Sequence, residues 1–207
     1  MVPTKENNLK LVRIVSYLTF DGHLYKDLSG FYLSSNNINT LNEFQKEVKE
    51  LFNLISKRLE KNNYCYGNKN YKLRFFNTQI SKYLQKLGTP EGNKTLTEFR
   101  VPNWIKNNKN LSKEYLKIAY FCEGCNKEKR KNPRIQFNIN KSKNKLENGL
   151  NFINDLKDML KQFNIETGKT TITTGNIRKD LIITKQLKFR ILTRDNKKFI
   201  NKIKWIK

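Results

Sequence analysis

The chain has 207 residues, of which 37% are hydrophobic, so it can fill a core and general disorder is not expected. Its 42 Lys and Arg residues against 18 Asp and Glu leave a formal net charge of +24 at pH 7, which favours a polyanionic partner such as nucleic acid. No apolar run reaches the length of a membrane span and no signal peptide opens the chain. We therefore expect a cytoplasmic protein that binds no membrane.

The chain repeats one element order, α-β-β-α-β-β-α, in two halves. The recognisable segments of the first half are a helix over 9–20, short strands over 23–25 and 30–34, a helix over 41–55, a strand over 71–76 and a helix over 80–87. Those of the second half are a helix over 111–122, strands over 126–130 and 134–139, a helix over 146–163, a strand over 187–192 and a helix over 197–206. These patterns predict an α+β fold of two pseudo-symmetric halves with antiparallel strands.

Gly and Pro residues between the halves predict a linker. We expect an N-terminal half over 1–88, a linker over 89–110 and a C-terminal half over 111–207. Because the two halves already form a covalent pseudo-dimer, we expect a monomer.

Each half places one acid in the same unusual position. Asp21 and Glu123 each follow an apolar helix and precede a glycine, and they are 102 residues apart (123 − 21). An acid at a helix C-terminus faces the negative end of the helix dipole, which costs roughly a few tenths to 1 kcal/mol. A duplicated structural module would not need this placement twice. Two carboxylates of this kind suit Mg²⁺, for which Mn²⁺ can substitute, in phosphodiester hydrolysis.

The motifs around these acids resemble the two copies of the LAGLIDADG motif. The segments concerned are residues 14–22, IVSYLTFDG, and 116–124, LKIAYFCEG. The segment from Gly88 to Ile105 and the strand and helix that begin at Tyr71 are also similar to parts of the double-motif homing endonucleases encoded in archaeal introns and inteins.

This resemblance implies a fold and an activity. The two motif helices would pack side by side, with Asp21 and Glu123 at the centre of a DNA-binding saddle formed by two antiparallel sheets. The implied reaction is metal-dependent hydrolysis of both strands of double-stranded DNA at a long target site, leaving short 3′ overhangs. Some members of the family carry a polar and a basic residue near the scissile phosphates, and the corresponding pairs here are Ser35-Asn36 and Asn140-Lys141, of which only Lys141 is basic. We expect a free-standing enzyme rather than an intein.

Basic and polar residues on the predicted strands supply the other site candidates. Lys141, Lys72 and Lys188 are candidates for stabilising charge at the scissile phosphates, and Lys72 and Arg74 fall opposite Lys188 and Arg190 in the repeat. Alternate side chains of a β-ribbon face the bases in a major groove. The candidate DNA-binding residues are Tyr25, Tyr32, Ser34, Asn36, Arg74, Lys127, Lys129, Arg130, Arg134, Gln136, Asn138 and Arg190.

Two other functions fit the same sequence. One is an RNA maturase that assists the splicing of its intron RNA, and the other is a DNA-binding protein that has lost cleavage. Cutting of DNA that depends on a divalent metal distinguishes the endonuclease from both.

Overall fold

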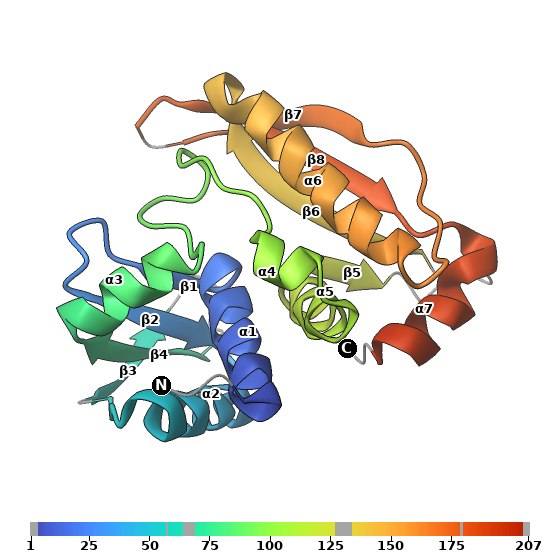
Figure 1. The fold of residues 1–207 in the computed structure, drawn as a ribbon. Coiled ribbons are helices and arrows are strands. Elements are labelled where there is room, and N and C mark those ends of the chain that lie inside the picture. Colours follow the sequence, from blue (N-terminus) through green and yellow to red (C-terminus); the bar gives the residue numbers. More distant parts are fainter. Residues whose placement is uncertain (1–3, 57, 64–68, 127–133, 179, 205–207) are drawn as a thin grey trace. The chain divides into compact units, whose positions relative to one another are not determined.

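The computed structural model describes residues 4–56, 58–63, 69–126, 134–178 and 180–204, and Figure 1 shows the order of their elements. The chain divides into two compact units, residues 1–92 (unit 1) and 93–207 (unit 2). Within the described ranges, no helix is long and apolar enough to cross a membrane.

Unit 1 has the predicted α-β-β-α-β-β-α order. Its elements are α1 (Lys5–Thr19), β1 (Gly22–Leu24), β2 (Gly30–Ser35), α2 (Ile38–Phe52), β3 (Arg58–Asn63), β4 (Lys69–Phe76) and α3 (Thr78–Lys86). The strands form an antiparallel sheet in the order β1-β2-β4-β3.

Unit 2 repeats this order after one additional short helix. Its elements are α4 (Asn103–Lys106), α5 (Lys109–Glu123), β5 (Gly124–Asn126), β6 (Ile135–Ser142), η1 (Lys143–Lys145), α6 (Leu146–Lys161), β7 (Thr171–Ile177), β8 (Ile183–Arg190), η2 (Thr193–Asp195) and α7 (Asn196–Ile203). The antiparallel sheet has the equivalent order, β5-β6-β8-β7. The predicted α+β class and the two pseudo-symmetric halves are therefore confirmed.

Asparagine side chains define where several helices begin. Asn37, Asn77 and Asn108 precede α2, α3 and α5, and each side chain accepts a hydrogen bond from a backbone N–H of the first turn. Since the first N–H groups of a helix have no partner within it, such caps stabilise each helix by about 1 kcal/mol. The abundant Asn residues thus contribute directly to the element boundaries.

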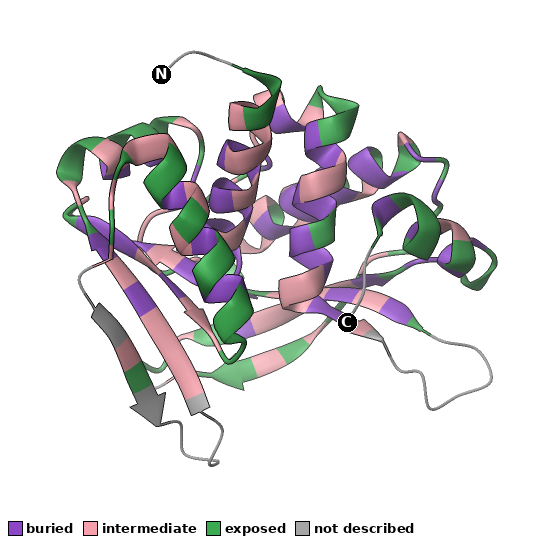
Figure 2. Cartoon of the chain, turned by 90° about the horizontal axis from the view of Figure 1, so that it is seen from below, coloured by how far each residue is buried: buried purple, intermediate pink, exposed green. Residues whose placement is uncertain are grey.

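Alternation along the strands separates two faces in each sheet. In unit 1, Phe31 and Leu33 of β2 and Phe75 of β4 are buried against the helices, whereas Tyr32 between them is only half-buried. In unit 2, Phe137 and Phe189 are buried in the same way. Figure 2 shows this mixture of buried and more exposed residues along the strands. Each sheet therefore has one helix-covered face and one polar face, which we call the open face.

Candidate nucleic-acid interface

Each of the two acids lies at the junction between a helix and a strand. Asp21 is exposed in the turn that joins α1 to β1. Glu123 is the last residue of α5 and is half-buried, directly before β5. The repeat therefore places both carboxylates at equivalent points of the fold.

The glycine after each acid allows the strand to begin immediately. A Cβ atom on Gly22 would lie 2.8 Å from the carbonyl oxygen of Tyr32 and 2.9 Å from Cα of Leu18. A Cβ atom on Gly124 would lie 2.2 Å from the carbonyl oxygen of Tyr120. Because neither position has room for a side chain, glycine fixes where the chain turns and thereby where the preceding acid stands.

The position of each acid is unfavourable with respect to the dipole of its helix. The last turns of α1 and α5 contain no basic residue, and both acids face the negative end of a helix dipole. Among the described residues, no salt bridge involves Asp21. An exposed acid in an unfavourable position favours a ligand-binding role over a structural one.

The donor chemistry of Asp21 and Glu123 fits a hard divalent cation. Mg²⁺ in proteins is held by one or two carboxylates together with water and substrate phosphate oxygens. No group of three or more His, Cys, Asp or Glu side chains that could hold a metal occurs among the described residues. An ion at either acid would therefore need oxygen ligands from water and phosphate.

The open face of unit 1 brings together most of its predicted DNA-binding residues. Tyr32 pairs with Arg74, and Ser34 pairs with Lys72, across the β2–β4 ladder. His23 of β1 stacks on Tyr32 at a centroid distance of 5.1 Å, an arrangement that the sequence did not indicate. Side chains from three strands thus share one surface.

Arg74 is held within that surface by two partners. Its Nε donates to Oε2 of Glu60 at 3.0 Å, and its Nη1 donates to the Tyr25 hydroxyl at 2.8 Å. Lys72 Nζ lies 4.4 Å from the centroid of the Tyr32 ring. Partial burial, together with the nearby charge of Arg74, lowers the pKa of Lys72. The cations of unit 1 are therefore partly engaged by its own aromatic and acidic side chains.

The open face of unit 2 presents amides and cations instead. Gln136 pairs with Arg190, and Asn138 pairs with Lys188, across the β6–β8 ladder. These pairs are equivalent to Tyr32–Arg74 and Ser34–Lys72 in unit 1, as the repeat predicts. Gln186 joins the same face one pair further along.

Other predicted site residues lie outside these pairs. Asn36 is exposed in the bend after β2, and Arg134 is exposed directly before β6. Lys127, Lys129 and Arg130 fall outside the described residues.

Lys141 does not lie on an open face. It has the same strand parity as Phe137, is only 1% exposed, and donates from Nζ to the carbonyl oxygens of Lys94 at 2.9 Å and Thr97 at 2.6 Å. Its ammonium also lies 3.9 Å from the centroid of the Phe99 ring. Burial lowers the pKa of Lys141 to about 8. The lysine, expected from the sequence near a scissile phosphate, therefore anchors the chain before α4 from the helix-covered side of the sheet.

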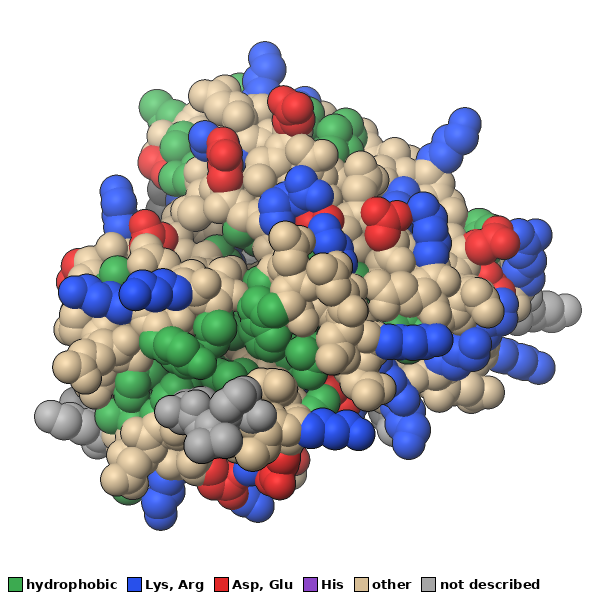
Figure 3. Space-filling view, viewed as in Figure 1, with side chains coloured by type: hydrophobic (Ala, Val, Ile, Leu, Met, Phe, Trp, Pro, Cys, Tyr) green, Lys and Arg blue, Asp and Glu red, His purple; other side chains and the backbone are tan. Residues whose placement is uncertain are grey.

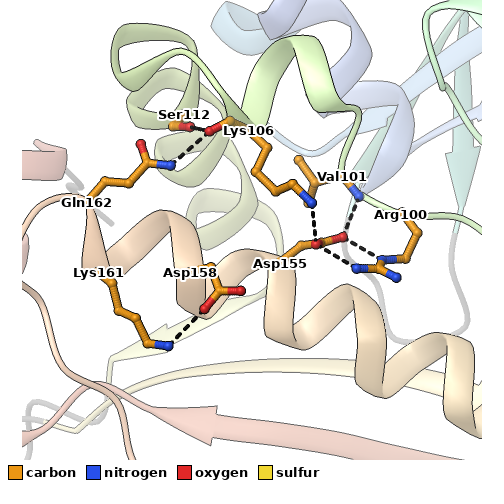
Figure 4. Close-up of polar contacts among 8 residues, drawn as sticks. All are labelled: Arg100, Val101, Lys106, Ser112, Asp155, Asp158, Lys161 and Gln162. Carbon is orange, nitrogen blue, oxygen red and sulfur yellow. Dashed lines mark hydrogen bonds and ion pairs between the residues drawn. The ribbon is translucent and has the colours of Figure 1, made fainter.

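Asp155, which sequence reasoning missed, is a second residue that binds the segment 94–106. Figure 4 shows Arg100, Val101 and Lys106 converging on this carboxylate of α6. Arg100 binds both carboxylate oxygens, through Nε at 2.6 Å and Nη2 at 2.8 Å. Residues 94–106, part of the expected linker, are therefore bound along unit 2 rather than forming a loose tether.

Positive charge is spread widely over the face of the molecule that Figure 3 shows. In the view of Figure 3, Lys and Arg side chains project from many places, with acidic side chains between them. Such a distribution attracts a polyanion without selecting a sequence, because phosphate contacts position a protein and base contacts specify the site. Sequence selection would then depend on the open faces.

The sequence matches no family model. It is similar to short portions of several archaeal proteins that differ from one another in their names. It is 30% identical, over 89% of its length, to 15% of the DNA-directed RNA polymerase subunit Rpo1N of Methanocaldococcus jannaschii. It is 29% identical, over 75% of its length, to 9% of the replication factor C small subunit of the same organism. It is 25% identical, over 93% of its length, to 20% of the tRNA-splicing ligase RtcB of Methanopyrus kandleri. The chain thus spans a fifth or less of each of these relatives.

Solved structures show the same architecture more directly. Variants of the homing endonuclease I-DmoI match with a TM-score of 0.59 and 16% identity, covering 96% of this chain and 91% of theirs. I-DmoI bound to its nicked target DNA in the presence of Mn matches with a TM-score of 0.59 and 16% identity, covering 96% and 97%. The N-terminal LAGLIDADG domain of DUF199/WhiA matches with a TM-score of 0.57 and 11% identity, covering 98% and 83%. The chain therefore has the fold that I-DmoI and the LAGLIDADG domain of WhiA share.

Proposed function

We propose that this protein is a divalent-metal-dependent DNA endonuclease of the LAGLIDADG homing type. The observation that carries the proposal is the repeated junction of helix, acid and glycine, which places Asp21 and Glu123 at equivalent points of the two units. The solved structure of I-DmoI with target DNA and Mn supports the same combination of fold, ligand and metal.

The pattern of relatives supports a mobile module. A similar segment occurs within an RNA polymerase subunit, a replication factor and a tRNA-splicing ligase, where it occupies 9 to 20% of each, so no one of their separate activities explains the likeness. A self-contained element inserted into different hosts accounts for this distribution, and a site-specific DNA endonuclease is an activity that would spread such an element.

In the proposed reaction, each unit supplies one carboxylate and one open face. Asp21 and Glu123 provide hard oxygen ligands, and Lys72 and Lys188 neutralise phosphate charge from equivalent strand positions. Divalent ions bound to such carboxylates activate a water molecule and stabilise the leaving oxygen of a phosphodiester. The products are double-strand breaks with short 3′ overhangs, made by a monomer.

The test is cleavage of a plasmid library of candidate insertion sites. Purified protein is incubated with Mg²⁺ or Mn²⁺, or with a chelator, and new DNA ends are sequenced. Uniform 3′ overhangs that require the metal are the expected result. Salt-sensitive binding of duplex DNA without any cutting would replace the proposal with a non-cutting DNA-binding protein. Preferential binding of structured intron RNA over duplex DNA would replace it with a maturase.

A further inference from the structure

A chain of side-chain hydrogen bonds crosses the open face of unit 2. Nε of Arg190 donates to Oε1 of Gln136 at 3.3 Å, and Nε2 of Gln136 donates to Oδ1 of Asn138. Gln136 and Arg190 face each other on neighbouring strands, and Asn138 faces Lys188 one pair further along. Arg190 is exposed, whereas Gln136 and Asn138 are half-buried. We call these three hydrogen-bonded residues the relay.

The relay fixes the orientation of both amides. Because a guanidinium group has donors and no acceptor, it must meet the oxygen of Gln136. The amide nitrogen of Gln136 then points to Asn138 and donates to its side-chain oxygen. The amide nitrogen of Asn138 is thereby left as the outward group at the end of the relay.

Around the relay, the hydrogen-bonding groups that remain are mainly donors. Arg190 retains its Nη groups, Asn138 presents its amide nitrogen, and Lys188 opposite carries three N–H donors and no acceptor. In the major groove, guanine presents two acceptors, N7 and O6, and no donor. Adenine presents one acceptor and one donor, thymine presents one acceptor and a methyl group, and cytosine presents a donor. A surface of donors therefore complements guanine best and cytosine least.

We propose that the open face of unit 2 selects guanine at adjacent positions of the DNA half-site that it contacts. This inference rests on the proposed DNA-binding function and adds the base preference of one half. Arg190 and Asn138 are the specificity-determining residues, and Gln136 acts as a positioning residue that sets the direction of the Asn138 amide.

Among the described residues of unit 1, the positions equivalent to the relay do not carry the same donors. Its matching arginine, Arg74, binds Glu60 through Nε and Tyr25 through Nη1, and the residue opposite it is Tyr32 rather than an amide. Glu60 adds an acceptor to that surface. The guanine preference is accordingly expected in one half of the target site and not in the other.

The substitution Gln136→Glu tests the relay with a minimal change of shape. A carboxylate can accept from both Arg190 and the amide nitrogen of Asn138, so the Asn138 amide would turn and present its oxygen outward. An outward acceptor pairs with the N4 amino group of cytosine or the N6 amino group of adenine. At one position of the half-site, we expect preference to move from guanine to adenine or cytosine by about tenfold.

Gln186→Glu is the matched control. Gln186 lies on the same open face, opposite Asn140, and is not part of the relay. The substitution adds the same negative charge as Gln136→Glu. It is expected to weaken DNA binding through charge while leaving the guanine preference unchanged. Both variants and the wild type are used to select bound sequences from a duplex library randomised across the target site.

The outcomes separate the inference from the function on which it rests. Wild-type selection of guanine at adjacent positions in one half, changed by Gln136→Glu and kept by Gln186→Glu, supports the inference. Binding and cutting of DNA without a guanine preference in either half overturns the inference alone, as does the same base preference in wild type and Gln136→Glu. A protein that selects no duplex DNA overturns both proposals.

Discussion

Replacing Asp155 with asparagine should destabilise unit 2 by far more than removing a neighbouring acid. The Asp155 carboxylate is 3% exposed and accepts hydrogen bonds from Nε and Nη2 of Arg100, the backbone N–H of Val101 and Nζ of Lys106. Breaking a fully buried ion pair costs about 3–5 kcal/mol. Since the side chains of Arg100 and Lys106 are 48% and 27% exposed, water can solvate them after the change. We therefore expect a loss of about 2 kcal/mol for Asp155→Asn.

Asp158→Asn is the matched control on the same helix. Asp158 pairs with Lys161 at 2.9 Å, but the two side chains are 60% and 72% exposed, so its loss should cost less than about 0.5 kcal/mol. Urea unfolding followed by tryptophan fluorescence measures the difference, because both tryptophans, Trp104 and Trp205, belong to unit 2. Equal unfolding midpoints for the two variants would refute this account of the anchor.

The effect of Asp155 should also depend on pH. Burial raises the pKa of Asp155, but the hydrogen bonds and charges of Arg100 and Lys106 outweigh burial, and the net pKa lies below the usual value of an aspartate. A carboxyl group whose pKa is lower in the folded state stabilises the fold at pH values above its unfolded-state pKa. This stabilisation is lost as the pH falls through the folded-state pKa. The stabilities of wild type and Asp155→Asn should therefore differ at neutral pH and converge below about pH 4.

Three further changes test other parts of the fold. Gly124→Ala should cost about 1–3 kcal/mol in urea unfolding, since its Cβ would lie 2.2 Å from a carbonyl oxygen, whereas Gly168→Ala, with its nearest atom at 3.9 Å, should be close to neutral. Wild-type stability should rise between pH 8 and 10.5, because in this range the native state has released a proton from Lys141 that the unfolded chain retains. The pKa difference between 10.5 and about 8 corresponds to about 3 kcal/mol. Lys141→Met should remove this rise. Glu60→Gln should release Arg74 for phosphate contact, which would tighten duplex binding and steepen its salt dependence by about one counterion. An unchanged salt slope would contradict that role.

The repeat in the sequence was enough to predict which strand positions are equivalent in the two halves. Lys72 and Lys188 were expected at equivalent positions, and the ladders place them opposite Ser34 and Asn138. The expected and observed positions agree because side chains alternate between the two faces of a strand, so one buried residue fixes the face of all the others.

Contacts between residues far apart in the sequence could not be predicted in the same way. Lys141 was expected near the scissile phosphates because the resemblance places a basic residue at the end of this strand, although its parity with Phe137 indicated the helix-covered face. Asp155 stands among apolar positions of α6, but its partner Arg100 precedes it by 55 residues and nothing in the sequence pairs them. Glu60 likewise changes the availability of Arg74 through a cross-strand contact that no motif indicates.

The measurement that tests the central claim most directly is strand-resolved cleavage of a mapped target by Asp21→Asn and Glu123→Gln. Asp27→Asn and Glu147→Gln, which alter exposed acids in the same two units, serve as charge-matched controls. We predict that either change at a helix–glycine junction abolishes metal-dependent double-strand cleavage, with duplex binding retained, and that the controls cut as the wild type does. Double-strand cleavage at the wild-type rate by Asp21→Asn or Glu123→Gln would contradict the assignment of the metal ligands.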